Sequence, residues 1–170
     1  MLHRNGNFTL KVQAGGQTGV DRAGLDAAMA AGFPTNGWFP LGRWAEDGEI
    51  PSCYRGKEVP SRLPEVRTVF NVATSDGSII LTTGEPKDGT PFTKECALLL
   101  GKSLLEIDLD HPISPEQVVS WIRANSIRTL NVAGPRESHR PGFVYSTALA
   151  YLTEVFSLLR QNVAEADLNR

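Results

Sequence analysis

Residues 13–24, QAGGQTGVDRAG, join a short apolar strand over residues 8–14 to a helix over residues 19–31. Small residues recur at helical spacing in this helix, which would let it lie close against a sheet. The paired glycines, Gly15 and Gly16, permit another group to approach the backbone closely. Thr18 and Asp21 have the spacing of a capping box. A strand, a glycine turn and a helix in this order are typical of the first unit of an α/β fold.

The same alternation continues along the chain. The pattern predicts strands over residues 76–83, 103–109 and 127–134, and helices over residues 65–74, 90–100, 114–125 and 141–160. Residues 36–64 show no clean period. The order predicts a single Rossmann-like domain of the α/β class over residues 1–170, with a mostly parallel sheet and helices on both faces. Residues 1–7 and 161–170 are expected to be flexible.

Composition excludes several classes of protein. The 170 residues carry a net charge of -2, which gives no bulk electrostatic reason to bind nucleic acid or an anionic membrane. No apolar run approaches the roughly 20 residues of a membrane span. Cys53 and Cys96 lie far apart and form no CxxC pair, which suits a reducing cytoplasm and argues against zinc. Cys96 is expected in the core.

Three glycine turns follow predicted strands: AGGQTGVD at 14–21, TTGEPKDGT at 82–90 and AGPRES at 133–138. Turns that follow parallel strands meet at one edge of the sheet, where ligands bind near the switch point of the strand order. Bare backbone N–H groups at a helix N-terminus favour an anion. The alternative is that the glycines only make tight turns and that Thr18 and Asp21 only cap a helix. The first turn is neither a Walker A loop nor GxGxxG, and Asp26 is too near to be the usual ribose-binding acid.

Polar and aromatic residues of the irregular segment are further candidates. Trp38 or Trp44 could stack on a flat heterocycle, and Arg43 could bind phosphate. Glu46 or Asp47 could accept hydrogen bonds from ring N–H groups. The alternative is a solvated loop whose tryptophans pack over the sheet edge.

Two more arginines could reach a phosphate. Arg22 could instead pair with Asp26, four residues on, which we favour. Arg136 follows a glycine at the predicted ligand edge, so we favour a binding role there. His139 is expected to be exposed. No Ser/His/Asp or Cys/His set is legible, so no catalytic residue and no metal ligand are predicted.

Four stretches resemble the molybdenum-cofactor (Moco) carrier proteins: GGQTGVDRAGLDAA, the GW-P-GR-AEDG-IP pattern at 37–51, SDGSIIL at 75–81 and LNVAGPRES at 130–138. That family belongs to a Rossmann-like superfamily (LOG/SLOG) that includes the lysine-decarboxylase-like phosphoribohydrolases. The resemblance covers about residues 10–158. It implies a cytoplasmic homo-oligomer, a dimer or tetramer, that binds, protects and transfers molybdenum cofactor, a pyranopterin phosphate, as cargo.

The turn chemistry and the resemblance together give sixteen candidate cofactor-binding residues: Gly15, Gly16, Gln17, Thr18, Gly19, Trp38, Arg43, Thr82, Thr83, Gly84, Gly89, Thr90, Gly134, Pro135, Arg136 and Ser138. The chain departs from the family at Phe39 and Leu41, where cysteine and lysine are common. Loss of that lysine removes one cation from the predicted pocket.

An enzyme is the alternative function. Phosphoribohydrolases of the superfamily carry PGGxGTxxE, and the equivalent stretch here is GEPKDGTPFTKE at 84–95. Thr93 stands where their glutamate is expected, and the double glycine is missing, so the carrier function is favoured. A nucleotide-binding sensor stays open. Apolar residues of the last helix, from Phe143 to Leu159, favour an oligomer.

Overall fold

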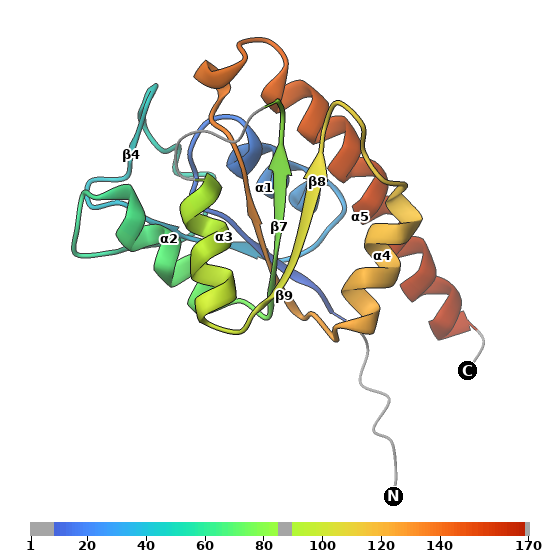
Figure 1. Ribbon diagram of the computed structural model, residues 1–170. Helices are drawn as coiled ribbons and strands as arrows, with labels where there is room; N and C mark the ends of the chain where they lie inside the picture. The colour runs from blue at the N-terminus through green and yellow to red at the C-terminus, as the bar shows by residue number, and fades with distance from the viewer. Residues whose placement is uncertain (1–8, 85–89, 169–170) are drawn as a thin grey trace, which may run out of the picture.

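A five-stranded parallel sheet forms the centre of the protein (Figure 1). The computed structural model describes residues 9–84 and 90–168, with side chains to residue 161. The strand order is β2-β1-β9-β7-β8, with β1 at Lys11–Gln13, β2 at Thr35–Asn36, β7 at Gly77–Thr82, β8 at Ser103–Asp108 and β9 at Thr129–Ala133. All neighbouring strands of this sheet pair in parallel. The predicted parallel sheet is confirmed.

Helices cover both faces of the sheet, as predicted (Figure 1). They are α1 (Val20–Ala30), α2 (Pro64–Ala73), α3 (Thr90–Leu99), α4 (Pro115–Ala124) and α5 (Val144–Leu168). Helices α1, α4 and α5 pack together over one face, and α2 and α3 pack together over the other. The main core lies under α1, α4 and α5, where apolar strand side chains are fully buried. Helix α5 runs to Leu168, so the predicted end near residue 160 is too early.

The strand order places a switch point between β9 and β7. Strand β9 leads to α5 on one face, and its neighbour β7 leads to α3 on the opposite face. Two adjacent strands that send their helices to opposite faces leave a crevice at their carboxyl ends, where open α/β sheets bind ligands.

The start of α1 differs from the prediction. Gly19, with φ 76° and ψ -127°, is the N-cap residue, and no side chain caps the helix there. Thr18 therefore lies outside the helix, and the predicted capping box with Asp21 is wrong. A glycine adopts this positive φ without strain, so the chain turns into the helix one residue later than the box requires.

The segment over residues 36–64 is folded into small sheets. Strand β3 (Trp38–Phe39) pairs in parallel with β6 (Lys57–Glu58), and β4 (Trp44–Ala45) forms a hairpin with β5 (Gly48–Glu49). The first residue of the segment, Asn36, belongs to β2 of the main sheet. A second core anchors the segment to the main fold, with buried residues Ala14, Leu25, Phe39, Ala45, Ile50 and Tyr54. Pairs of two-residue strands have no legible period, which explains why the sequence showed none.

Local signals at two other sites are confirmed. Ser114 and Gln117 form a complete capping box before α4, with Pro115 at its first position. Cys96 is buried in a small cluster with Val72 and Ala97.

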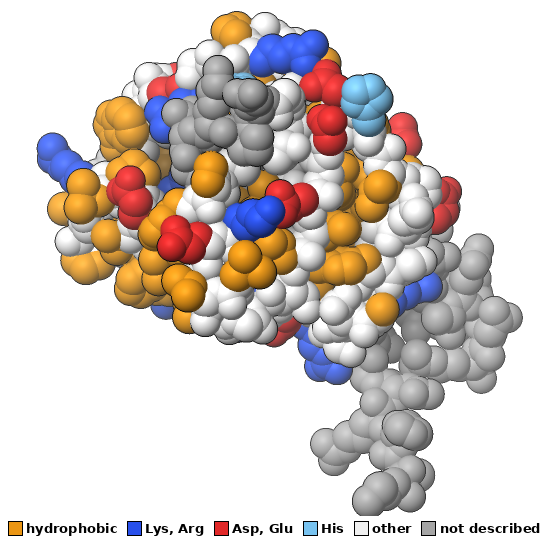
Figure 2. Space-filling model, in the orientation of Figure 1, with side chains coloured by type: hydrophobic (Ala, Val, Ile, Leu, Met, Phe, Trp, Pro, Cys, Tyr) orange, Lys and Arg blue, Asp and Glu red, His pale blue; other side chains and the backbone are white. Residues whose placement is uncertain are grey.

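The exposed apolar side chains lie elsewhere than predicted. Residues Leu152, Phe156 and Leu159 of α5 are fully buried within the chain, so their apolar character is no evidence for an oligomer. Figure 2 instead shows apolar side chains over α2 and α3. The exposed large apolar residues of these two helices include Phe70 of α2 and, at the end of α3, Leu98 and Leu99, which are 63% and 79% exposed. The homo-oligomer stays a prediction. Within the described residues, no helix is long and apolar enough to cross a membrane.

Candidate functional site

The first and third glycine turns touch at the carboxyl edge of the sheet. The Val20 N–H donates to the carbonyl of Pro135 at 3.2 Å. A methyl group on Gly19 would lie 2.5 Å from the same oxygen, so only glycine allows this contact. Gly134 is equally confined, because its methyl would lie 2.6 Å from the Leu81 carbonyl. These glycines let the two turns pack together, which confirms that they share one edge.

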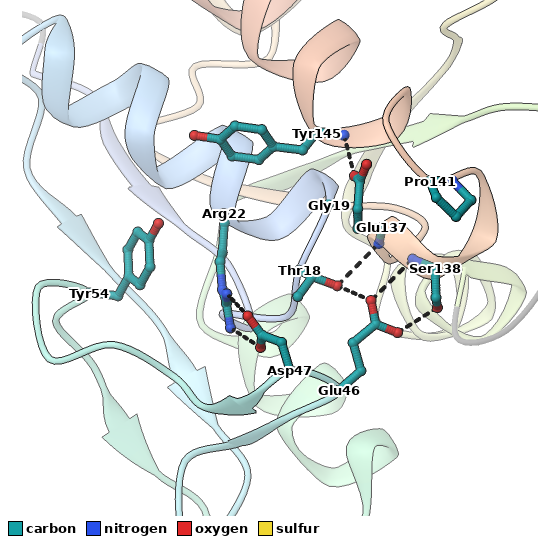
Figure 3. Close-up of a pocket in the computed structure, with 10 residues that line it drawn as sticks. All are labelled: Thr18, Gly19, Arg22, Glu46, Asp47, Tyr54, Glu137, Ser138, Pro141 and Tyr145. Carbon is teal, nitrogen blue, oxygen red and sulfur yellow. Dashed lines mark hydrogen bonds and ion pairs between the residues drawn. The ribbon is translucent and has the colours of Figure 1, made fainter.

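Hydrogen bonds to Glu46 connect the 36–64 segment to the first and third glycine turns (Figure 3). Its carboxylate accepts hydrogen bonds from the Thr18 hydroxyl and from the Ser138 hydroxyl and N–H. The Thr18 hydroxyl in turn accepts the Glu137 N–H at 3.1 Å. Partial burial pushes the pKa of Glu46 up, but these hydrogen bonds outweigh it and lower that pKa. An ionised Glu46 therefore holds three chain segments together.

A crevice of about 450 Å³ lies at the switch point, between the turns and helices α2 and α3. Its size falls in the range of small-molecule sites. It is lined by Gln17, Asp21, Pro64, Glu65, Arg67, Thr68, Phe92, Thr93, Ala133, Gly134 and Arg136.

A buried ion pair forms one wall of the crevice. Arg67 Nη1 lies 3.2 Å from Asp21 Oδ2, and their side chains are only 16% and 4% exposed. Burial raises the pKa of Asp21, against the pull of Arg67 and of hydrogen bonds from the backbone of Gln17 and Gly15. A methyl on Gly15 would lie 1.8 Å from Arg67 Nη1. In this structure the bare backbone of Gly15 therefore accommodates a guanidinium.

Backbone donors of the first turn are engaged by the chain itself. The Gln17 N–H donates to Asp21, and the Thr18 N–H donates to the Gln17 side-chain oxygen. A methyl on Gly16 would lie 2.9 Å from the Phe39 ring. The guanidinium groups of the crevice are therefore better placed for an anion than these N–H groups.

Arg136 stands on the third turn, across the crevice from α2. Its Nε lies 3.9 Å from Glu46 Oε2, with 30% of the side chain exposed. Glu137, its neighbour, is occupied elsewhere, because its carboxylate accepts the N–H groups of Gly142 and Tyr145 before and at the start of α5. Two guanidinium groups thus enter the crevice from two elements distant in sequence.

A polar network joins the second turn to Arg140, just after the third turn. Arg140 donates to both the Thr83 hydroxyl and the Asp110 carboxylate, and Thr83 also donates to Asp110. The Arg140 hydrogen bond lowers the pKa of Asp110. Thr82 and Gly84 stand at the same end of β7, and buried Thr90 opens α3. Gly89 lies outside the described residues.

A second cavity, here called the tyrosine pocket, opens on the α1 and α5 side of the two turns (Figure 3). It measures about 580 Å³ and is lined by Thr18, Gly19, Arg22, Glu46, Asp47, Tyr54, Glu137, Ser138, Pro141 and Tyr145. Arg22 makes a bidentate ion pair with Asp47, at 2.6 and 2.8 Å. The predicted pair with Asp26 is wrong, because Asp47 from the β4–β5 turn reaches the guanidinium and Asp26 accepts two tyrosine hydroxyls instead.

Trp38 and Arg43 line neither cavity. The Trp38 ring packs against Phe70 of α2, with ring centres 4.9 Å apart, and its indole N–H donates to Thr74. The Arg43 guanidinium donates to the carbonyls of Ile50, Pro51 and Tyr54. Through these contacts Trp38 and Arg43 stabilise the fold of the 36–64 segment. His139, predicted to be exposed, is half-buried beside the Thr83 carbonyl.

The two departures from the family pattern also lie away from the cavities. Phe39 is fully buried under Gly16, and Leu41 is 46% exposed in a turn. The absence of the family's lysine at position 41 therefore removes no positive charge from the lining of either cavity.

Sequence reasoning missed Arg67. The available signal was its position one helical turn before Asn71, on the stripe of α2 that also buries Thr68. Among the described residues, no group of three or more His, Cys, Asp or Glu side chains could hold a metal ion.

The parallel sheet, its touching glycine turns and the crevice at its switch point define a Rossmann-like α/β protein. Residues 12–156 match the model of the circularly permutated YpsA SLOG family, so the chain belongs to that family. A crystal structure from Syntrophus aciditrophicus SB, described as a "Putative molybdenum carrier protein", is 40% identical with a TM-score of 0.80. The match covers 88% of this chain and 96% of that one. The comparison with curated proteins gives no match.

Proposed function

We propose that the protein binds, protects and transfers molybdenum cofactor, and that the crevice holds it. The observation that carries this proposal is the pair of guanidinium groups, Arg67 and Arg136, in one crevice at the switch point. Guanidinium groups bind phosphate through charge-assisted hydrogen bonds. The similar protein described as a molybdenum carrier supports the choice of cargo.

The donor set of the crevice fits a pyranopterin phosphate. A guanidinium has five N–H donors, so Arg67 can hold Asp21 and a phosphate oxygen together. Glu65 lines the same crevice, and its carboxylate can accept hydrogen bonds from ring N–H groups. The cofactor would bring the metal and its sulfur ligands, and this chain would supply phosphate binding and shelter from water.

Native mass spectrometry of the protein purified without oxygen from a cofactor-producing host tests the proposal. We expect a bound species with the mass of the pterin cofactor. The same protein from a host that lacks the cofactor pathway is the control and should lack that mass. Equal spectra from both hosts would contradict the proposal.

The carrier role also implies a cytoplasmic homo-oligomer, a dimer or tetramer, which light scattering of the purified protein would detect.

We expect no phosphoribohydrolase activity. Thr93, at the position of the family enzymes' glutamate, is buried and lines the crevice, while Glu95 is exposed on another side of α3. The crevice side of α3 thus offers a hydroxyl where that hydrolysis uses a carboxylate. Chromatography of the protein incubated with AMP should show no more free adenine than the Thr93→Ala control. Adenine release well above that control would favour the enzyme.

A further inference from the structure

The tyrosine pocket has the wrong charge for a phosphate. Three carboxylates, Glu46, Asp47 and Glu137, line it against one guanidinium, that of Arg22. The crevice, in contrast, has two guanidinium groups against two carboxylates. The two cavities share no lining residue, and they open on opposite sides of the touching turns. They are therefore suited to ligands of different charge.

Two aromatic rings form the apolar part of the pocket and are fixed in place. The Tyr54 and Tyr145 hydroxyls both donate to Asp26 Oδ2, at 3.1 and 2.7 Å. The pKa of Tyr145 is raised to about 12, by burial first and then by Asp26, so this hydroxyl stays protonated and keeps donating. Figure 3 shows both rings beside Arg22, across the pocket from Glu46 and Ser138. The Tyr145 ring is only partly buried, so it presents a face on which a planar ligand can stack, whereas Tyr54 is buried and its ring lies under the Arg22 guanidinium.

Asp47 provides a positioned acceptor at the mouth of the pocket. Arg22 holds its carboxylate by both oxygens, and this hydrogen bonding lowers the pKa of Asp47. The side chain is nevertheless 49% exposed. A carboxylate has about four lone-pair sites, so the bidentate pair leaves acceptor capacity toward the pocket.

We propose that the tyrosine pocket is a second binding site, for a flat heterocycle that carries N–H donors, is neutral or cationic, and bears no phosphate. The ring stacks on Tyr145 and donates to Asp47. The acidic lining selects against anions. This proposal does not rest on cofactor binding in the crevice, because the two cavities share no lining residue.

A fluorescence titration with unsubstituted pterin (2-amino-4-oxopteridine) tests the proposal. We expect saturable binding, and weaker binding of 6-carboxypterin, which adds a negative charge. Asp47→Asn should weaken pterin binding about tenfold or more, because a charge-assisted hydrogen bond is lost. Because Asp47→Asn removes a negative charge, it should also reduce the ratio between the affinities for pterin and for 6-carboxypterin. Glu49→Gln, an exposed change in the same hairpin, is the matched control and should leave both affinities unchanged.

Two further variants keep the result interpretable. Tyr145→Leu removes a ring without removing charge and should also weaken pterin binding, with circular dichroism confirming the fold. Glu65→Gln changes a crevice residue and should leave pterin binding unchanged. Pterin binding that is lost in Glu65→Gln but kept in Asp47→Asn would place the ring in the crevice and overturn this proposal, while cofactor binding there would stand. Absence of pterin binding to the unmodified protein would overturn it as well.

Discussion

Arg67→Ala is expected to lower the unfolding free energy by about 3 kcal/mol at neutral pH, because it leaves the buried Asp21 carboxylate without its cation. Asp21 is 3% exposed, so water replaces the lost guanidinium poorly. Urea denaturation followed by circular dichroism measures the change. Arg62→Ala, in the exposed chain just before α2, is the matched control and should stay within about 0.5 kcal/mol of the unmodified protein. A loss below about 1 kcal/mol in Arg67→Ala would show that the pair is not buried as described.

The same pair gives a signed pH dependence. Burial raises the pKa of Asp21 above its ordinary value of 3.8. Its contribution to stability is therefore fully present below pH 3.8 and is lost as the pH rises through the raised pKa. Removal of Arg67 raises that pKa further, so the loss of unfolding free energy caused by Arg67→Ala should shrink as the pH falls from neutral toward 3.8. The double variant Asp21→Asn/Arg67→Ala is compared with Asp21→Asn alone. The loss of unfolding free energy between these two variants should not change with pH over this range. A deficit of Arg67→Ala that grows on acidification would contradict this assignment.

Arg136→Ala is expected to weaken binding of the cofactor, or of inorganic phosphate as its stand-in, by about tenfold to a hundredfold. The reason is the loss of a charge-assisted hydrogen bond, worth roughly 1.5–3 kcal/mol, at the carboxyl end of β9. Isothermal titration calorimetry measures the affinity. Thermal stability should change little, because the Arg136 side chain is 30% exposed and ion pairs of partly exposed groups contribute little to stability.

Measuring melting and binding together separates two roles for Arg136. If Arg136 mainly held Glu46 and the third turn in place, Arg136→Ala would lower the melting temperature by several degrees and leave the affinity of the folded protein unchanged. Arg128→Ala, which removes an exposed arginine at the opposite end of β9, controls for net charge. Unchanged affinity in Arg136→Ala would remove this residue from the site.

Much of the fold was predictable because its signals are local. The capping box of Ser114 and Gln117 acts within one turn of α4, and Asp76 next to Gly77 marks the start of β7. Alternation of such elements constrains the chain to a parallel sheet with helices on both faces. Parallel strands then bring the turns after β1 and β9 to one edge, which is why the glycine turns were found together.

The side-chain partners at that edge depend on the tertiary structure. Glu46 and Ser138 are 92 residues apart, and Arg67 and Asp21 are 46 apart, and no local spacing relates them. The prediction that Arg22 pairs with Asp26 used the carboxylate four residues on in its own helix. The folded chain offers Asp47 as a bidentate partner, and the tyrosines claim Asp26.

The sequence by itself determined the order of strands and helices and the glycine turns, because backbone propensity and periodicity act over a few neighbouring residues. Only the tertiary structure decided how the turns divide the edge into two cavities of different net charge. The strand order β1-β9-β7 sets α5 and α3 on opposite faces, so the crevice receives Arg67 from α2 and the tyrosine pocket receives Tyr145 from α5. The net charge at each cavity comes from residues of several chain segments, and these segments meet only after the sheet has formed.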